Sequence, residues 1–207
     1  ASASIRWAKL FHQCNAANPH AGQIAINSFI LPLNLSRDRP WRMQAELTMN
    51  QIVIVENLLS DEMIETAFSL VRKLNLEDSK VGKRVDPIQK VRQDCFLSSR
   101  DCAPIDSIIL KSINKIVERD FGISIEYRER WKIGYYKGED GGHYNAHTDI
   151  QGKMEHRQLS LVIALSDPAD YQGGELYFRE IDRSFLLKKG SCILFKPELV
   201  HEVRPVT

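Results

Sequence analysis

The second half of the chain is dominated by short segments in which apolar and polar residues alternate. The alternation begins after residue 122 and places six residues on one face of an extended chain: Ile123, Ile125, Tyr127, Trp131, Ile133 and Tyr135. Strand-like segments recur at 158–165, 175–178, 184–187, 192–195 and 200–203, with Gly- or Pro-containing turns between them. Short, regularly spaced strands of this kind are typical of a β-sandwich or a barrel.

Two amphipathic segments precede this β region and predict helices. The first begins at the N-cap candidate Ser60, and acidic residues that the helix dipole favours fill its first turn. The second begins with Pro104 at its first helical position and ends at Gly122. Its predicted buried face consists of Ile105, Ile108, Ile109, Ile113, Ile116 and Val117. We expect both helices to cover a sheet rather than to bind a cofactor.

The remaining segments are less informative. Residues 1–50 are interrupted by Pro19, Pro32 and Pro40, and we expect an extension with one or two short helices and no chemistry. The apolar run at 52–55 predicts a buried strand. Residues 80–101 carry six basic and three acidic residues. They are interpreted as a solvated loop with an edge strand, and the alternative is a basic flap that meets an acidic substrate.

Composition excludes several classes of protein. Lys and Arg number 28 against 27 Asp and Glu, which argues against a general nucleic-acid binder. No apolar run approaches the roughly 20 residues of a membrane span, and the first residues do not resemble a secretory signal. Four scattered cysteines are expected to be free thiols, because Cys95 and Cys102 lack a second pair that would complete a zinc site. The expected compartment is therefore a reducing cytoplasm.

One cluster of residues points to metal chemistry. His147 and Asp149 lie two residues apart after a glycine-rich approach, so in an extended chain both side chains point to the same face. His201, in the last strand-like segment, can supply a third ligand. Two histidines and one carboxylate are the facial triad of non-haem Fe(II) oxygenases, although the same set could hold Zn(II) or Mn(II) in a cupin-like barrel. The histidines outside this pattern are expected to be surface or supporting residues: His12, His20, His143 and His156.

From about residue 50 to its end, the chain resembles the Fe(II)- and 2-oxoglutarate-dependent dioxygenases of the prolyl 4-hydroxylase-like group. The motifs that carry the resemblance are Tyr-x-x-Gly at 136–139, Tyr144, His147-x-Asp149, the stretch from Arg157 to Leu165, Gly173-Gly174-Glu-Leu-Tyr-Phe and His201-Glu-Val-x-Pro-Val. The resemblance implies an α+β, mostly β fold, with a double-stranded β-helix (jelly-roll) core in residues 51–207 and the helices packed on one sheet.

The resemblance also implies roles for particular residues. His147, Asp149 and His201 match the iron ligands, while Tyr136 and Ser160 match positions in the 2-oxoglutarate pocket. The implied cofactors are Fe(II), with 2-oxoglutarate and O2 as co-substrates and ascorbate as an optional addition. Arg157 is expected to be an ion-pair partner that supports the fold, and Gly173-Gly174 to allow a tight turn.

One expected residue is missing. The family holds the far carboxylate of 2-oxoglutarate with a Lys or Arg some nine or ten residues after the distal histidine, and the final strand would lie there too. The sequence stops at Thr207, six residues after His201. We therefore expect the native protein to continue past Thr207, with a Lys or Arg roughly four residues further on by the resemblance.

The predicted activity is hydroxylation of an unactivated C–H bond, with a prolyl or other side chain of a protein or peptide as the preferred substrate. A free amino acid or a small metabolite is the alternative substrate. An alternative of another class is a non-catalytic metal-binding barrel or interaction module, which the intact triad disfavours and the missing anchor favours. Neither a nucleic acid nor a membrane is an expected partner.

Overall fold

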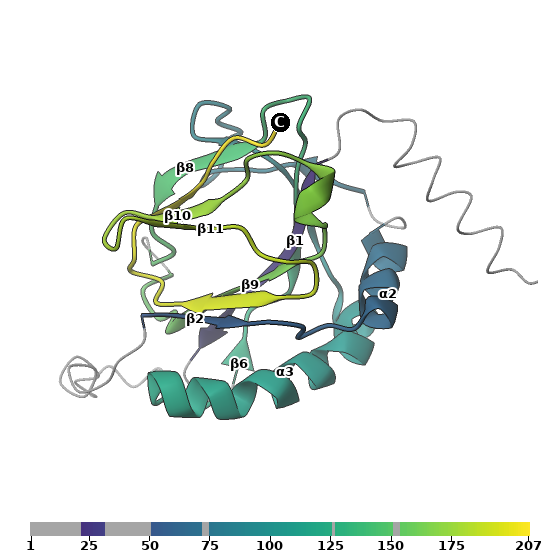
Figure 1. The fold of residues 1–207 in the computed structure, drawn as a ribbon, viewed down its shortest axis with the longest axis vertical. Coiled ribbons are helices and arrows are strands. Elements are labelled where there is room, and N and C mark those ends of the chain that lie inside the picture. The colour runs from purple at the N-terminus through teal and green to yellow at the C-terminus, as the bar shows by residue number, and fades with distance from the viewer. Residues whose placement is uncertain (1–21, 32–50, 72–74, 126, 151–153) are drawn as a thin grey trace, which may run out of the picture.

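The computed structural model describes residues 22–31, 51–71, 75–125, 127–150 and 154–207. Within these ranges two antiparallel sheets face each other, and two helices cover the outer side of the larger sheet (Figure 1). The larger sheet has the strand order β2-β12-β9-β1-β7-β5-β3, with β6 also paired to β1. The smaller sheet has the order β11-β10-β13-β8-β4. This mostly β arrangement with added helices confirms the predicted fold class.

The strands of the larger sheet are β1 (Gln23–Leu31), β2 (Ile52–Val55), β3 (Glu77–Asp78), β5 (Gln93–Phe96), β6 (Tyr127–Arg128), β7 (Lys132–Tyr136), β9 (Leu159–Ala164) and β12 (Cys192–Phe195). Those of the smaller sheet are β4 (Lys90–Val91), β8 (His143–His147), β10 (Leu176–Phe178), β11 (Arg183–Phe185) and β13 (His201–Val203). A short 3-10 helix, Pro168–Asp170, lies between β9 and β10. The strands predicted after residue 150 are all present, with ends shifted by one or two residues.

The helices α2 (Asp61–Val71) and α3 (Ser99–Phe121) pack their apolar faces on the larger sheet. The helix residues of the shared core include Ile64 and Ala67 from α2 and Ile109, Ile113 and Val117 from α3. Across from them lie sheet residues such as Ile26, Ile133, Leu161 and Ile163. This core fixes the larger sheet as a rigid wall, and the inner face of that wall is left to the cavity described below. Neither of the two helices in the described ranges is long and apolar enough to cross a membrane.

The predicted helix ends are partly confirmed. Ser60 Oγ accepts a hydrogen bond from the backbone N–H of Met63 at 3.4 Å, and Gly122 ends α3 with a φ of 67°. The predicted start of α3 at Pro104 was wrong, because the helix begins at Ser99 and Pro104 lies inside it. Its first turn forms earlier, where Cys102 N–H donates to Ser98 O at 3.1 Å.

Two residues that the sequence pattern predicted to be on buried faces are exposed in the structure. Ile108 is 43% exposed, since the buried stripe of α3 repeats at Ile109, Ile113 and Val117 and leaves its neighbour outside. Tyr127 is 55% exposed, because β6 pairs only with the end of β1. The alternation continues in β7, where Ile133 faces the helices and Tyr136 faces the cavity.

The largest difference from the sequence prediction is β1, since residues 23–31 form a strand where short helices were expected. The strand lies between β7 and β9 and pairs with both along most of its length. Its position near the middle of the larger sheet makes these residues part of the core. The remainder of 1–50 lies outside the described residues, and a domain boundary at residue 50 stays a prediction.

The turn at Gly173-Gly174 confirms the structural role predicted for it. Both glycines have a positive φ, of 72° and 71°. A Cβ atom on Gly173 would lie 2.0 Å from the backbone oxygen of Pro205, so a side chain cannot be accommodated without moving the backbone. The turn brings Gly173 into a bridge with Val206 and thereby attaches the last described residues to the fold.

Candidate metal centre and cavity

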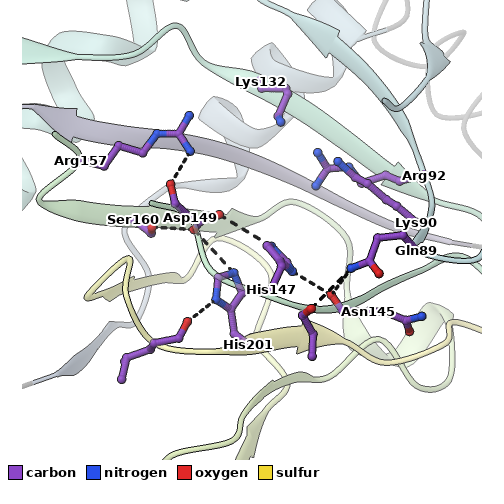
Figure 2. A network of polar contacts seen from close by, with 12 residues as sticks. Gln89, Lys90, Arg92, Lys132, Asn145, His147, Asp149, Arg157, Ser160 and His201 are labelled. Carbon is purple, nitrogen blue, oxygen red and sulfur yellow. Dashed lines mark hydrogen bonds and ion pairs between the residues drawn. The ribbon is translucent and has the colours of Figure 1, made fainter. Parts of the chain in front are cut away.

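A cavity of about 320 Å³ lies between the two sheets. Residues of β1, β7 and β9 form one wall, and residues of β8, β10 and β13 form the opposite wall. The three predicted ligands, the predicted pocket residues Tyr136 and Ser160, and several basic side chains all line this space. Figure 2 shows the three ligands together with Ser160 and the nearby basic side chains. A volume of this size is in the range of small-molecule sites.

The structure brings His147, Asp149 and His201 together. One potential ligand atom from each lies within 4.8 Å of the others. His147 ends β8 and His201 begins β13, and these two residues face each other directly in the antiparallel register, with ring centroids 4.3 Å apart. The register shifts between His201 and Val203, a bulge that separates this pair from the regular ladder. Asp149 lies in a bend just after β8 rather than in the strand itself.

Hydrogen bonds orient both imidazole rings. Nδ1 of His147 lies 2.9 Å from the backbone oxygen of Asn145, and Nδ1 of His201 lies 2.9 Å from that of Leu199. Each ring therefore carries its proton on Nδ1, donates it to a carbonyl and leaves Nε2 with a free lone pair. The two Nε2 atoms lie 3.7 and 3.6 Å from the carboxylate oxygens of Asp149. Burial, with the proximity of His201, lowers the pKa of His147 to about 3, so this ring is a neutral nitrogen donor at pH 7.

Three hydrogen bonds hold Asp149, one at its carboxylate and two at its backbone. Ser160 Oγ donates to its Oδ2 at 2.7 Å, and its backbone N–H donates to Pro197 O at 2.8 Å. Its backbone oxygen accepts a hydrogen bond from Arg157 Nη1 at 2.9 Å. Arg157 also makes a bidentate ion pair with Glu129, with distances of 2.6 and 2.7 Å, which confirms its predicted role as an ion-pair partner. Ser160 was matched to the co-substrate pocket, and it lines the cavity while its hydroxyl is directed at Asp149.

Two tyrosines complete the wall around the histidines. The ring of Tyr144 stacks on His147, with centroids 3.5 Å apart, and burial followed by the charge of Asp149 raises the pKa of its hydroxyl to about 12. The buried Tyr136 lies in the cavity wall as expected, and its hydroxyl accepts a hydrogen bond from Arg92 Nη1 at 3.0 Å. Burial also raises the pKa of Tyr136, although Arg92 opposes that shift. Both phenols are therefore neutral hydrogen-bonding groups.

The sequence prediction missed a buried basic cluster: Lys90, Arg92 and Lys132, grouped around Asp94. Arg92 Nε lies 2.6 Å from Asp94 Oδ1, and the two lysine ammonium groups lie 3.7 and 3.8 Å from Asp94 Oδ2. Burial and the charge of Arg92 lower the pKa of Lys90 to about 6 and that of Lys132 to about 8. Although burial opposes it, attraction by Arg92 and the two lysines lowers the pKa of Asp94 to about 2.

The segment 80–101 therefore fits neither interpretation in full. Some of its basic residues are exposed, as a solvated loop requires, but Lys90 and Arg92 form part of the cavity wall. The available signal was the period-two spacing of Lys90, Arg92 and Asp94, which puts all three on one face of an extended chain.

The remaining candidates lie elsewhere. His143 is half-buried, with its two ring nitrogens near the backbone oxygens of Gly141 and Ile88, as expected for a supporting residue. Cys95, Cys102 and Cys192 form no disulfide, while Cys14 lies outside the described residues. The described ranges contain no other group of three His, Cys, Asp or Glu side chains that could hold a metal.

The donor set fits a divalent first-row metal ion. Two imidazole nitrogens and one carboxylate converge from one side, and the carboxylate is the only acidic group among them. In six-coordination such a set leaves three positions open toward the cavity. The site combines this donor set with a double-sheet barrel, and that combination defines the class of non-haem iron oxygenases.

Comparisons with known proteins agree with this class. Residues 131–207 match the model of the 2OG-Fe(II) oxygenase superfamily. The chain is 27% identical over 170 residues to a PKHD-type hydroxylase from Hyphomonas neptunium, covering 75% of this chain and 72% of the relative. It is 23% identical over 163 residues, with the same coverage, to a PKHD-type hydroxylase from Crocosphaera subtropica.

Solved structures share the fold. A Pseudomonas putida prolyl-4-hydroxylase matches with a TM-score of 0.56 and 19% identity, over 77% of this chain and 88% of that one. A prolyl hydroxylase from Trichoplax adhaerens, in complex with a peptide fragment of the hypoxia inducible factor oxygen degradation domain, matches with a TM-score of 0.61 and 17% identity, over 82% and 89%. The chain is therefore similar to 2OG-Fe(II) oxygenases over residues 131–207 and to PKHD-type hydroxylases over three quarters of its length.

Proposed function

We propose that the protein hydroxylates a prolyl or other side chain of a protein or peptide, with Fe(II) held by His147, Asp149 and His201. The observation that carries the proposal is the convergence of these three donors, within 4.8 Å, on a cavity between the two sheets. Bound Fe(II), with 2-oxoglutarate and O2, supplies the oxidation of an unactivated C–H bond. The protein supplies the geometry and the environment of that reaction.

Each residue around the site has a definite task. The Nδ1 hydrogen bonds of the two histidines fix the tautomer that presents Nε2 to the metal. Ser160 donates a hydrogen bond to Oδ2 of Asp149 and would hold this carboxylate in place for a bound ion. The ring of Tyr144 lies flat against His147 and prevents it from rotating. A ligand set that is held in this way before the metal binds needs little rearrangement when it does.

The substrate class rests on the relatives. Two of them are PKHD-type hydroxylases, and one structural neighbour is a prolyl hydroxylase that contains a peptide fragment. Beside the cavity, the loop before β4 exposes Val85 and Ile88, which are 50% and 82% exposed, respectively. Apolar side chains at this position can contact an extended peptide more readily than a small metabolite.

The test is a hydroxylation assay on proline-containing peptides with Fe(II), 2-oxoglutarate and ascorbate. We expect succinate in proportion to peptides that gain one oxygen atom, as measured by mass spectrometry, and neither product from an Asp149→Ala variant. Free amino acids are assayed in parallel. Hydroxylation of free amino acids alone would contradict the peptide assignment, and absence of both products from every substrate would favour the non-catalytic barrel.

A further inference from the structure

The strand β8 contains an irregularity next to the metal position. His147 pairs with His201 and Tyr144 with Val203, so three steps along β8 match two steps along β13. A bulge of this kind changes the side to which neighbouring side chains point. It explains why the rings of Tyr144 and His147 stack although they are three residues apart, since a regular strand would put them on opposite faces. The direction of the His147 ring therefore depends on the bulge.

Asn145 lies in this bulge, and its hydrogen bonds join the loop before β4 to His147 (Figure 2). Its side-chain Nδ2 donates to the backbone oxygen of Ile88 at 2.7 Å, and its backbone N–H donates to that of Gln89 at 2.9 Å. Its own backbone oxygen accepts from Nδ1 of His147 at 2.9 Å and from Nε2 of Gln89 at 3.3 Å. One residue thus contacts the loop and the predicted metal ligand at the same time.

The loop is shaped to present these acceptors to β8. Oδ1 of Asp86 accepts hydrogen bonds from the backbone N–H groups of Ile88 and Gln89, both at 3.1 Å. The backbone oxygen of Asp86 accepts from the N–H of Lys90 at 2.8 Å. An aspartate that satisfies the N–H groups of its own turn in this way stabilises the turn locally. The backbone oxygens of Ile88 and Gln89 are then left for Asn145.

His143 holds the same loop from a second point. Its Nε2 lies 3.2 Å from the backbone oxygen of Ile88, and its Nδ1 lies 2.9 Å from that of Gly141. Two side chains of β8 therefore converge on one carbonyl group of the loop. His143 reaches the loop, whereas Asn145 reaches both the loop and His147.

We propose that Asn145 is a positioning residue for the metal ligand His147: its amide holds the bulge of β8 on the loop before β4, and the bulge aims the imidazole at the metal position. The proposal rests on the proposed function, because it takes His147 as a metal ligand. Without the amide, the bulge loses a contact that fixes its extra residue. The strand can then move toward a regular register, in which His147 points elsewhere.

The same contacts couple the loop to the metal position. The side chain of Ile88 is 82% exposed on the surface proposed to meet the peptide, while its backbone oxygen is bound to Asn145. A ligand that fixes the loop therefore also fixes the bulge. Because such coupling is reciprocal, a metal ion at His147 should in turn steady the loop.

The first measurement is the Mn(II) affinity of the full chain, determined by calorimetry without turnover. We expect Asn145→Ala to bind Mn(II) about 3- to 10-fold more weakly, as for the loss of one neutral hydrogen bond. Asn114→Ala is the matched control, because the side chain of Asn114 also makes hydrogen bonds, to Glu118 and Ile125, but lies on α3. The control should bind Mn(II) as tightly as the wild type.

The second measurement separates positioning from a purely structural role. Hydrogen exchange of residues 86–90 is followed by mass spectrometry with and without saturating Mn(II). In the wild type, Mn(II) should slow this exchange several-fold, because the metal fixes His147 and, through Asn145, the loop. In Asn145→Ala the slowing should disappear even when Mn(II) saturates the site. A residue that only stiffened the loop would change its exchange equally with and without the metal.

The outcomes separate the two claims. Unchanged Mn(II) affinity in Asn145→Ala, or exchange of the loop that responds to Mn(II) equally in variant and wild type, would overturn the positioning role and leave the metal site intact. Failure of the wild type to bind Mn(II) would overturn the proposed function as well. If Asn145→Ala does not fold, Asn145→Leu decides, because leucine has nearly the shape of asparagine without the amide. It should show both losses, and retention of either property would refute the proposal.

Discussion

The hydrogen bond from Ser160 to Asp149 allows a quantitative test of how the metal ligand is positioned. Ser160→Ala removes a hydroxyl that donates at 2.7 Å to a carboxylate oxygen, at a position only 1% exposed. A hydrogen bond to a charged acceptor contributes about 1.5–3 kcal/mol, or about 10- to 150-fold in an equilibrium constant. Loss of a group that orients a metal ligand typically weakens metal affinity by about 10- to 100-fold. We therefore predict that Ser160→Ala weakens metal affinity by about 10- to 100-fold.

The assay is an anaerobic titration with Mn(II) or Fe(II) followed by calorimetry. Ser166→Ala is the matched control, because Ser166 is also buried and its hydroxyl accepts from Ile24 N–H at 2.8 Å and donates to Gly22 O at 3.2 Å. That variant should have a lower Tm and unchanged metal affinity. The reasoning is refuted if Ser160→Ala binds metal as tightly as the wild type, or if both variants lose affinity equally.

Three further predictions concern the fold. Lys90 has its pKa lowered to about 6 in the folded protein, so it binds a proton on unfolding between about pH 6 and 10, and the free energy of unfolding falls as the pH drops through that range. Lys90→Met should reduce the slope of the free energy of unfolding against pH by up to about 1.4 kcal/mol per pH unit, as measured by urea unfolding. Gly173→Ala should lower the Tm much more than Gly82→Ala, since both have a positive φ but only Gly173 faces a backbone oxygen; equal losses would argue against the steric explanation. Ile113→Ala should lower the free energy of unfolding by about 2–5 kcal/mol in denaturant titrations and Ile108→Ala by far less, unless α3 is packed differently.

The strands after residue 150 could be predicted because the information is local. Alternation and turn residues are set within a few positions, and β9, β10 and β12 lie close to where the sequence placed them. The strand β1 could not be predicted in this way. It is paired on both sides, so it shows little alternation, and its partners β7 and β9 lie more than a hundred residues later. Only the assembled sheet reveals that it is a strand.

In the candidate site, too, the local sequence predicted some features and only the folded structure shows the others. The motif and the strand context pointed to His147, Asp149 and His201, and their spacing is readable in the sequence. The surroundings of these residues are not, because each contact joins distant segments: Ser160 lies 11 residues from Asp149, and Arg92 lies 44 residues from Tyr136. The burial of Arg92 depends on a glycine in the neighbouring strand, which no local pattern of basic residues indicates.

The central claim is that His147, Asp149 and His201 bind Fe(II) in a form that 2-oxoglutarate can chelate. The most direct measurement is the visible charge-transfer absorption that develops when Fe(II) and 2-oxoglutarate are added together without oxygen. The account predicts this band in the wild type at one iron per chain, and its loss in folded Asp149→Ala and His201→Ala variants. A band of equal intensity and affinity in those variants, or no band in the wild type, would contradict the account.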